Sequence, residues 1–259
     1  MLKTLLTDYL LNFKVKRSRI RRVIHRLCSE AVSRLLSDHE WELLTQEWYA
    51  KQQWSIELYE SDVLFEWENN ALRYFPKPPC SILVLAAGKG RELRALIKMG
   101  YSVFGIEMDR DCLKLIQDSC HFDKLLGVTR ASFLDITSQK EKLPKIPIGG
   151  IIIGWGALVN LPSKEVIVEL MRLLAAHYPK TPILLSGSSA YRPRSLLNYL
   201  PWNKTSPVND VTDFRRWFDQ GYGPCGNIKV DALERIFCSF GYDILYRNKK
   251  DEYPHWVLR

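Results

Sequence analysis

The chain has 259 residues, of which 46% are hydrophobic, and it carries a formal net charge of +8. This hydrophobic fraction excludes wholesale disorder, and the length allows one large domain or a core domain with an added subdomain. No apolar run of the sequence approaches the length that spans a bilayer, and the modest charge excess permits an acidic partner without requiring one.

Six cysteines are scattered along the chain without a C-x-x-C pair or an accompanying histidine cluster. This spacing argues against a structural zinc site, so we expect no metal. A chain of this size does not need disulfide bonds for stability. We therefore expect reduced thiols and a cytoplasmic setting.

Residues 1–79 are predicted to form a helical cap region. Apolar residues recur at helical spacing over residues 2–13 and 20–35, and Ser37 with Glu40 fits a capping box that begins another helix. A further helix is expected over residues 62–74. The basic stretch 14–26 is predicted to be a solvated helix face, with a surface for nucleic acid or anionic membrane as the alternative.

The sequence pattern changes after three prolines within residues 76–79, which stop a helix and stiffen a linker. From there strand and helix patterns alternate, which predicts an α/β fold with a doubly wound, mostly parallel sheet. The expected strands are residues 81–86, 102–106, 128–133, 148–153, 183–186, 242–247 and 253–258. The expected helices are residues 91–99, 110–120, 163–178 and 230–240. Residues 80–259 are thus predicted as one core, with a substrate-side insert at about 188–227.

A glycine-rich turn follows the first expected strand. Gly88 and Gly90 precede the next helix, and without a Cβ they let the backbone turn tightly and approach a ligand. Glu107 ends the second expected strand, 17 residues after Gly90. A carboxylate at that place can accept hydrogen bonds from both hydroxyls of a ribose. Since ligands bind beyond the carboxyl ends of parallel strands, we expect the site in the loops after the first four strands.

Around these two features the sequence reads SILVLAAGKGRELRALIKMGYSVFGIEMD, ending at Asp109. It resembles the first two motifs of the class I S-adenosylmethionine-dependent methyltransferases, and the resemblance extends in outline from about Cys80 to the C-terminus. The resemblance implies a Rossmann-like seven-stranded sheet with an antiparallel C-terminal hairpin, S-adenosyl-L-methionine as cofactor, and methyl transfer to an acceptor. The sequence IIIGWG, residues 151–156, resembles the fourth motif of the family.

The resemblance also implies where the cofactor would lie. The backbone of residues 86–90 would pass under its methionine part, and Glu107 would bind the ribose with Met108 packed on the adenine. Ser132 and Phe133 would lie beside the adenine. The cofactor-binding residues expected in this way are Ala86, Ala87, Gly88, Gly90, Glu92, Glu107, Met108, Ser132, Phe133, Trp155 and Gly156.

Several positions depart from the family pattern. The family often has an acid where this chain has Ala86, and often a glycine where it has Glu92. Members resembling thiopurine methyltransferase can carry an acid there, so Glu92 is either a partner for the cofactor's amino group or an acid favoured by the helix N-terminus. Ser132 stands at the position of the adenine-side acid, with Asp135 three residues later. Because of these departures, the alternative that the protein is a non-catalytic relative with the same fold stays open.

The acceptor is predicted to be a flat or apolar small molecule, because both the cap region and the insert are rich in aromatic side chains with polar tips. The alternative is that these aromatics pack the cap onto the sheet. The substrate-binding candidates are Tyr49, Trp54, Asn160, Tyr191 and Tyr222. No catalytic base is assigned, since each of the five histidines is expected to be structural. Glycines within residues 221–226 predict a mobile lid.

Three other functions compete with this interpretation. A nicotinamide-dependent oxidoreductase shares the G-x-G and the following acid, but it would have a third glycine at Glu92 and no terminal hairpin. An RNA or protein methyltransferase would use the basic stretch 14–26. A non-enzymatic relative would use the fold to bind partners.

Overall fold

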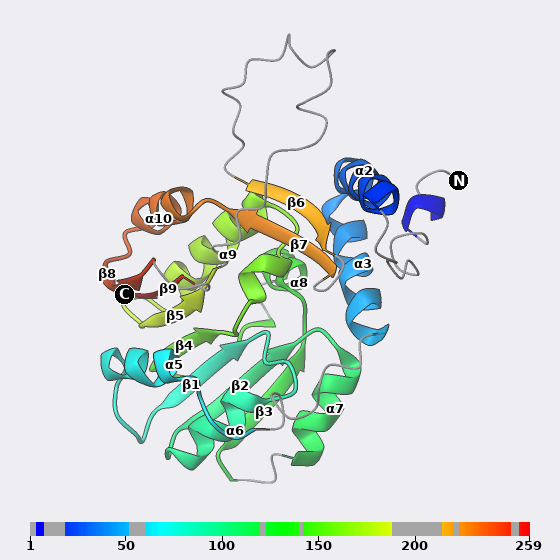
Figure 1. The fold of residues 1–259 in the computed structure, drawn as a ribbon. Helices are drawn as coiled ribbons and strands as arrows, with labels where there is room; N and C mark the ends of the chain where they lie inside the picture. The colour runs from blue at the N-terminus through cyan, green and yellow to red at the C-terminus, as the bar shows by residue number, and fades with distance from the viewer. Residues whose placement is uncertain are drawn as a thin grey trace.

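The computed structural model of the protein describes residues 4–7, 19–51, 61–119, 123–139, 142–187, 214–219, 223–249 and 254–259. Figure 1 shows a central twisted sheet with helices packed on both of its faces. Within the described residues, none of the helices has the length and apolar character needed to cross a membrane.

The central sheet has seven strands in the order β3-β2-β1-β4-β5-β9-β8. Its strands are β1 (Ser81–Leu85), β2 (Ser102–Glu107), β3 (Leu125–Arg130), β4 (Gly150–Ile153), β5 (Ile183–Ser186), β8 (Ile244–Asn248) and β9 (His255–Leu258). The first five pair in parallel, whereas β9 is antiparallel to both β5 and β8. The predicted fold class, with its seven strands and antiparallel C-terminal pair, is confirmed. The strand order reverses between β1 and β4, which is where such sheets open a crevice for ligands.

Helices cover both faces of this sheet. They are α6 (Arg91–Lys98), α7 (Arg110–Ser119), α8 (Phe133–Ser138), α9 (Lys164–His177) and α10 (Val230–Ser239), with the 3-10 turn η3 (Ala157–Asn160) after β4. Ser163 caps α9, because its hydroxyl accepts a hydrogen bond from the Val166 N–H at 3.4 Å.

Alternate residues of the strands pack into two separate hydrophobic cores, one on each face of the sheet. Leu83 and Leu85 pack with α8, α9 and α10 on one face. Ile82 and Val84 pack with α6, α7 and residues 64–75 on the other face. This alternation follows from the period of two along a strand, and burial on both faces explains why β1 and β4 are almost continuously apolar.

The segment before β1 differs from the single helix expected over residues 62–74. Residues 61–65 have no regular secondary structure and are followed by the short α5 (Glu66–Ala71) and η1 (Leu72–Tyr74). The late start has a local cause: the Glu68 carboxylate accepts a hydrogen bond from the Phe65 N–H at 2.7 Å and so fixes the beginning of α5.

The N-terminal helices α2 (Arg19–Leu35) and α3 (Asp38–Lys51) pack against a two-stranded hairpin, β6 (Phe214–Asp219) and β7 (Gly223–Ile228), beside the main sheet (Figure 1). Val32, Trp41, Leu44, Trp48 and Phe218 form the core of this contact. The Trp48 and Phe218 rings meet edge to face at 5.0 Å. The hairpin therefore ties the insert to the N-terminal helices.

The expected mobile lid is wrong for residues 223–226, which are buried in strand β7. Gly223 has φ +77°, and a Cβ on it would lie 2.3 Å from Cδ1 of Trp48. Glycine is required there because the Trp48 indole packs directly on the backbone. Close packing, and not mobility, accounts for this glycine.

Candidate functional site

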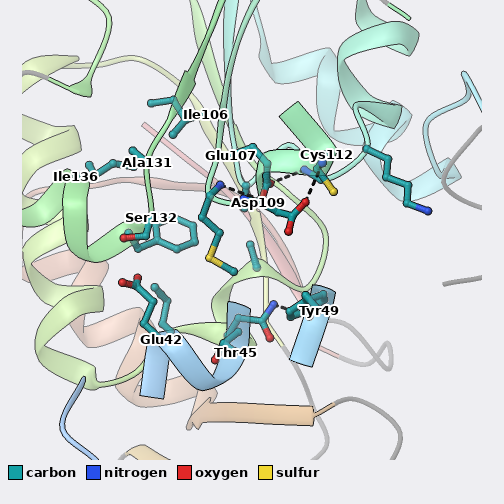
Figure 2. Close-up of a pocket in the computed structure, with 18 of the residues that line it drawn as sticks. Glu42, Thr45, Tyr49, Ile106, Glu107, Asp109, Cys112, Ala131, Ser132 and Ile136 are labelled. Carbon is teal, nitrogen blue, oxygen red and sulfur yellow. Dashed lines mark hydrogen bonds between the residues drawn. The ribbon is translucent and has the colours of Figure 1, made fainter. Parts of the chain in front are cut away.

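A cavity of about 290 Å³ opens at the carboxyl ends of β1, β2, β3 and β4. Its wall comes from the loops that follow these strands, from the start of α7 and from helix α3 (Figure 2). The lining residues are Glu42, Thr45, Tyr49, Ala50, Ala86, Gly88, Lys89, Ile106, Glu107, Met108, Asp109, Asp111, Cys112, Leu115, Ala131, Ser132, Phe133, Ile136, Trp155, Ala157, Asn160, Leu161 and Pro162. The crevice thus lies where the strand pattern predicts a ligand.

The turn after β1 has three residues in the left-handed region: Ala86 (φ 54°), Gly88 (φ 53°) and Gly90 (φ 84°). A Cβ on Gly88 would meet no heavy atom within 4 Å, so its backbone borders open space. A Cβ on Gly90 would lie 2.9 Å from Cγ1 of Ile116. Gly88 therefore leaves the backbone accessible from the cavity, whereas Gly90 lets α6 pack closely on α7.

The Glu107 carboxylate is fixed by three backbone N–H groups. Oε2 accepts a hydrogen bond from Gly88 N at 2.7 Å, and Oε1 accepts from Met108 N and Asp109 N, each at 2.9 Å. Only 7% of Glu107 is exposed. Burial raises the pKa of this carboxyl, and the three N–H donors oppose the rise. Two carboxylate oxygens offer about four acceptor positions, so capacity remains for a ligand hydroxyl.

The wall after β3 is apolar and ends in a helix cap. Ser132 accepts a hydrogen bond from Asp135 N at 3.0 Å, and Asp135 Oδ2 accepts from Ser132 N at 2.9 Å. Met108, Phe133 and Ile136 line the cavity nearby. The expected third strand was placed about three residues too late, because this reciprocal cap begins α8 where the strand was expected to continue. Asp135 is committed to the cap.

Glu42 is a cavity residue that the sequence analysis missed. It lies on α3 and is only 9% exposed. Burial raises the pKa of the Glu42 carboxyl, while the Ser132 hydroxyl and the Leu134 backbone N–H stabilise its charged form. Glu42, Thr45 and Tyr49 recur at helical spacing, so they form a polar stripe beside the apolar face of α3. That stripe is the signal that was present in the sequence.

The end of the cavity near β4 brings two predicted substrate residues into contact. The Asn160 side-chain amide donates a hydrogen bond to the Tyr49 hydroxyl at 2.9 Å, which joins η3 to α3. Trp155 also lines this end, and its ring meets the Phe65 ring edge to face at 5.2 Å. The other substrate candidates, Trp54, Tyr191 and Tyr222, lie outside the described residues.

Of the expected cofactor residues, Ala86, Gly88, Glu107, Met108, Ser132, Phe133 and Trp155 line the cavity, and Ala87, Gly90, Glu92 and Gly156 do not. Ala87 is buried in the core, and Gly156 N donates a hydrogen bond to the Ser186 hydroxyl at 3.2 Å.

Glu92 lies in a buried ion cluster away from the cavity wall. Arg91 Nη2 is 2.7 Å from Oε1 of Glu92 and 2.7 Å from Oε1 of Glu68. The Arg91 guanidinium also packs over the Phe65 ring, 4.1 Å from its centre. The cluster fixes α6 to the segment before β1.

The titratable groups of the wall are mostly acidic. The pKa of the Cys112 thiol is strongly raised, first by burial and then by Glu107 and Asp109. A thiol in this environment stays protonated near neutral pH and is a poor nucleophile. Within the described part of the chain, no group of three or more His, Cys, Asp or Glu side chains is arranged to hold a metal ion.

No protein-family model matches the chain, and a search of curated proteins finds no significant match. Solved structures match by fold. An S-adenosylmethionine-dependent methyltransferase from Leishmania major gives a TM-score of 0.60 at 14% identity, over 86% of this chain and 85% of that one. The 1,6-didemethyltoxoflavin-N1-methyltransferase from Burkholderia thailandensis, solved with 1,6-didemethyltoxoflavin and S-adenosylhomocysteine, gives 0.58 at 11% identity, over 86% and 89%. The glycopeptide N-methyltransferase MtfA, complexed with sinefungin, gives 0.53 at 14% identity, over 75% and 85%. The chain therefore has the fold of the S-adenosylmethionine-dependent methyltransferases, as its motifs predict.

Proposed function

We propose that this protein is an S-adenosylmethionine-dependent methyltransferase that acts on a small molecule. One observation supports the proposal above the others: Glu107 and the Gly88 backbone, 19 residues apart in sequence, meet at 2.7 Å on the wall of a single cavity. A carboxylate beside an accessible backbone turn, at the point where strand order reverses, is an arrangement suited to a nucleoside with a polar tail.

We assign wall residues to each part of such a cofactor. Glu107 would accept a hydrogen bond from a ribose hydroxyl, and Met108 and Phe133 would enclose the adenine in an apolar slot. The open backbone at Ala86 and Gly88 would face the methionine part. Glu92 is excluded from this set, because it is paired with Arg91.

Bound at this site, the cofactor supplies a methyl group on a sulfonium, which transfers by displacement with a good leaving group. The tasks left to the protein are to align the acceptor and to exclude water. Tyr49 and Asn160, joined by their hydrogen bond, would orient a polar group of the acceptor, and Trp155 would cover an apolar surface. An amine, thiol or acidic carbon needs little help from a general base, whereas a hydroxyl would need one.

A small-molecule acceptor also has support from two structural neighbours. The Burkholderia enzyme was solved with 1,6-didemethyltoxoflavin, and MtfA is a glycopeptide N-methyltransferase.

Incubation of the purified protein with S-adenosylmethionine labelled in the methyl group, together with fractionated lysate, tests the proposal. We expect label in a low-molecular-mass fraction. Label in RNA or protein, with a steep salt dependence lost when Arg21 and Arg22 are neutralised, would support the basic-stretch alternative instead. If no methyl label is transferred to any fraction, the result would favour a protein that binds partners without catalysing methyl transfer. Calorimetric titration with S-adenosylmethionine and NADH in parallel separates the oxidoreductase, which would bind only NADH.

A further inference from the structure

The proposed function leaves one buried group of the cavity unused. Glu42 is a second carboxylate on the wall, 9% exposed, and it comes from an N-terminal helix outside the sheet. Among the described residues, no lysine or arginine forms an ion pair with it. Of the charges nearby, Asp135 is repulsive, and His39 makes a smaller favourable contribution. Burying a carboxylate in this position costs free energy, and a ligand that brings a hydrogen-bond donor to it reduces that cost.

The position of Glu42 identifies which part of a ligand it would meet. The two groups that stabilise its charged form, the Ser132 hydroxyl and the Leu134 N–H, belong to the loop and helix after β3. Figure 2 shows Glu42 beside Ser132, with Tyr49 farther along the same helix. Glu42 thus lies at the β3 end of the cavity, and the hydrogen-bonded pair of Tyr49 and Asn160 lies at the β4 end.

The β3 end is also the end that suits a flat base. Met108, Phe133 and Ile136 give it an apolar lining, while Glu107 beside it suits the ribose. The edge of a purine bound there would face the Ser132 side. The Ser132 oxygen already accepts a hydrogen bond from Asp135 N, so the acceptor best able to meet an amine on that edge is the Glu42 carboxylate.

We propose that Glu42 accepts a hydrogen bond from the exocyclic amine of the cofactor's adenine, so that helix α3 supplies the carboxylate that recognises the base. This inference rests on the proposed function. It gives α3 a double role, because Tyr49 lies seven residues after Glu42, about 10 Å along the helix axis. One helix would then contact the base through Glu42 and the acceptor through Tyr49, and cofactor binding would help to position the acceptor side.

The test compares two ligands on three full-length proteins by calorimetry at about pH 8, where a glutamate is ionised. The ligands are S-adenosylhomocysteine and its inosyl analogue, in which a carbonyl oxygen replaces the exocyclic amine. The proteins are wild type, Glu42→Gln and Glu47→Gln. Glu47 is the matched control, because it lies on the same helix but is exposed and paired with Lys51.

We expect wild type to prefer the adenosyl ligand by about tenfold or more, the value of one hydrogen bond to a charged acceptor. Glu42→Gln should lose most of this preference, because a rotated amide can donate to the carbonyl of the inosyl analogue. Glu47→Gln should keep the wild-type ratio. Thermal unfolding of each variant monitors its folding.

Two results overturn the inference, and they differ from a failure of the proposed function. A wild-type ratio near one shows that no group reads the amine, and this result does not depend on any variant. An unchanged ratio in Glu42→Gln shows that another group reads it. If wild type binds neither ligand, the proposed function fails together with the inference.

Discussion

The substitution Arg91→Met tests how α6 is fixed to the segment before β1. Arg91 forms ion pairs with both Glu68 and Glu92, and the exposed fractions of these three side chains are 5%, 1% and 8%. Methionine preserves much of the volume but leaves two buried carboxylates without their partner. Breaking a buried ion pair from one side costs about 3–5 kcal/mol, and for a chain of this size that lowers Tm by roughly 6–20 °C.

The loss of unfolding free energy in Arg91→Met should grow as the pH rises. Burial raises the pKa of Glu68 above its ordinary 4.5, and Arg91 opposes the rise. Between the unfolded and folded pKa values the folded protein binds more protons than the unfolded chain, so the free energy of unfolding falls as pH rises through that interval. Arg91→Met removes the opposing charge and widens the interval. The deficit of the variant should therefore be larger at about pH 8 than at about pH 5.

Urea unfolding followed by tryptophan fluorescence measures these values. The control is Arg172→Met, which removes an exposed arginine paired with Glu169 and should leave the unfolding midpoint unchanged. A destabilisation by Arg91→Met below about 1 kcal/mol would show that the ion cluster does not stabilise the fold by the expected amount. A loss of unfolding free energy that becomes smaller toward high pH would show the same.

Three further predictions concern the turn chemistry and the cavity wall. Gly223→Ala should lower the free energy of unfolding in urea by about 1–3 kcal/mol more than Gly156→Ala does. Both residues have positive φ, but only at Gly223 would a Cβ meet Trp48, so equal losses would contradict this packing. Ser132→Ala should lower the free energy of unfolding by about 1 kcal/mol through loss of the α8 cap, and a neutral result would contradict the cap assignment. Cys112 should react with iodoacetamide far more slowly than the exposed Cys238 at about pH 8, as peptide mass mapping would show, since its thiol pKa is raised; equal rates would refute the protonated state.

The sequence predicted the features that depend on local pattern. The apolar runs of β1 and β4 are buried on both faces, so hydrophobicity alone identifies them. Gly88 and Glu107 were found because a backbone turn and a strand end impose residue types at fixed places. These two positions were also enough to locate the cavity.

The missed features depend on contacts between distant residues. Glu42 is buried because α3 lies over the loop after β3. The polar stripe of α3 is visible in the sequence, but the loop against which it packs is not. Glu92 was expected to face a ligand, but Glu68, 24 residues earlier, brings a second carboxylate to Arg91 and draws both into one cluster. Gly223 of β7 suggested mobility because its packing partner, Trp48, is on another element.

The central claim is that Glu107 and the turn at Gly88 together hold an adenosyl group. Calorimetric titration of S-adenosylhomocysteine into wild type, Glu107→Ala and the exposed surface control Asp118→Ala tests it most directly. We predict micromolar binding to wild type and Asp118→Ala, and binding weakened by about tenfold or more in a folded Glu107→Ala protein. Equal affinity in all three proteins would contradict the account.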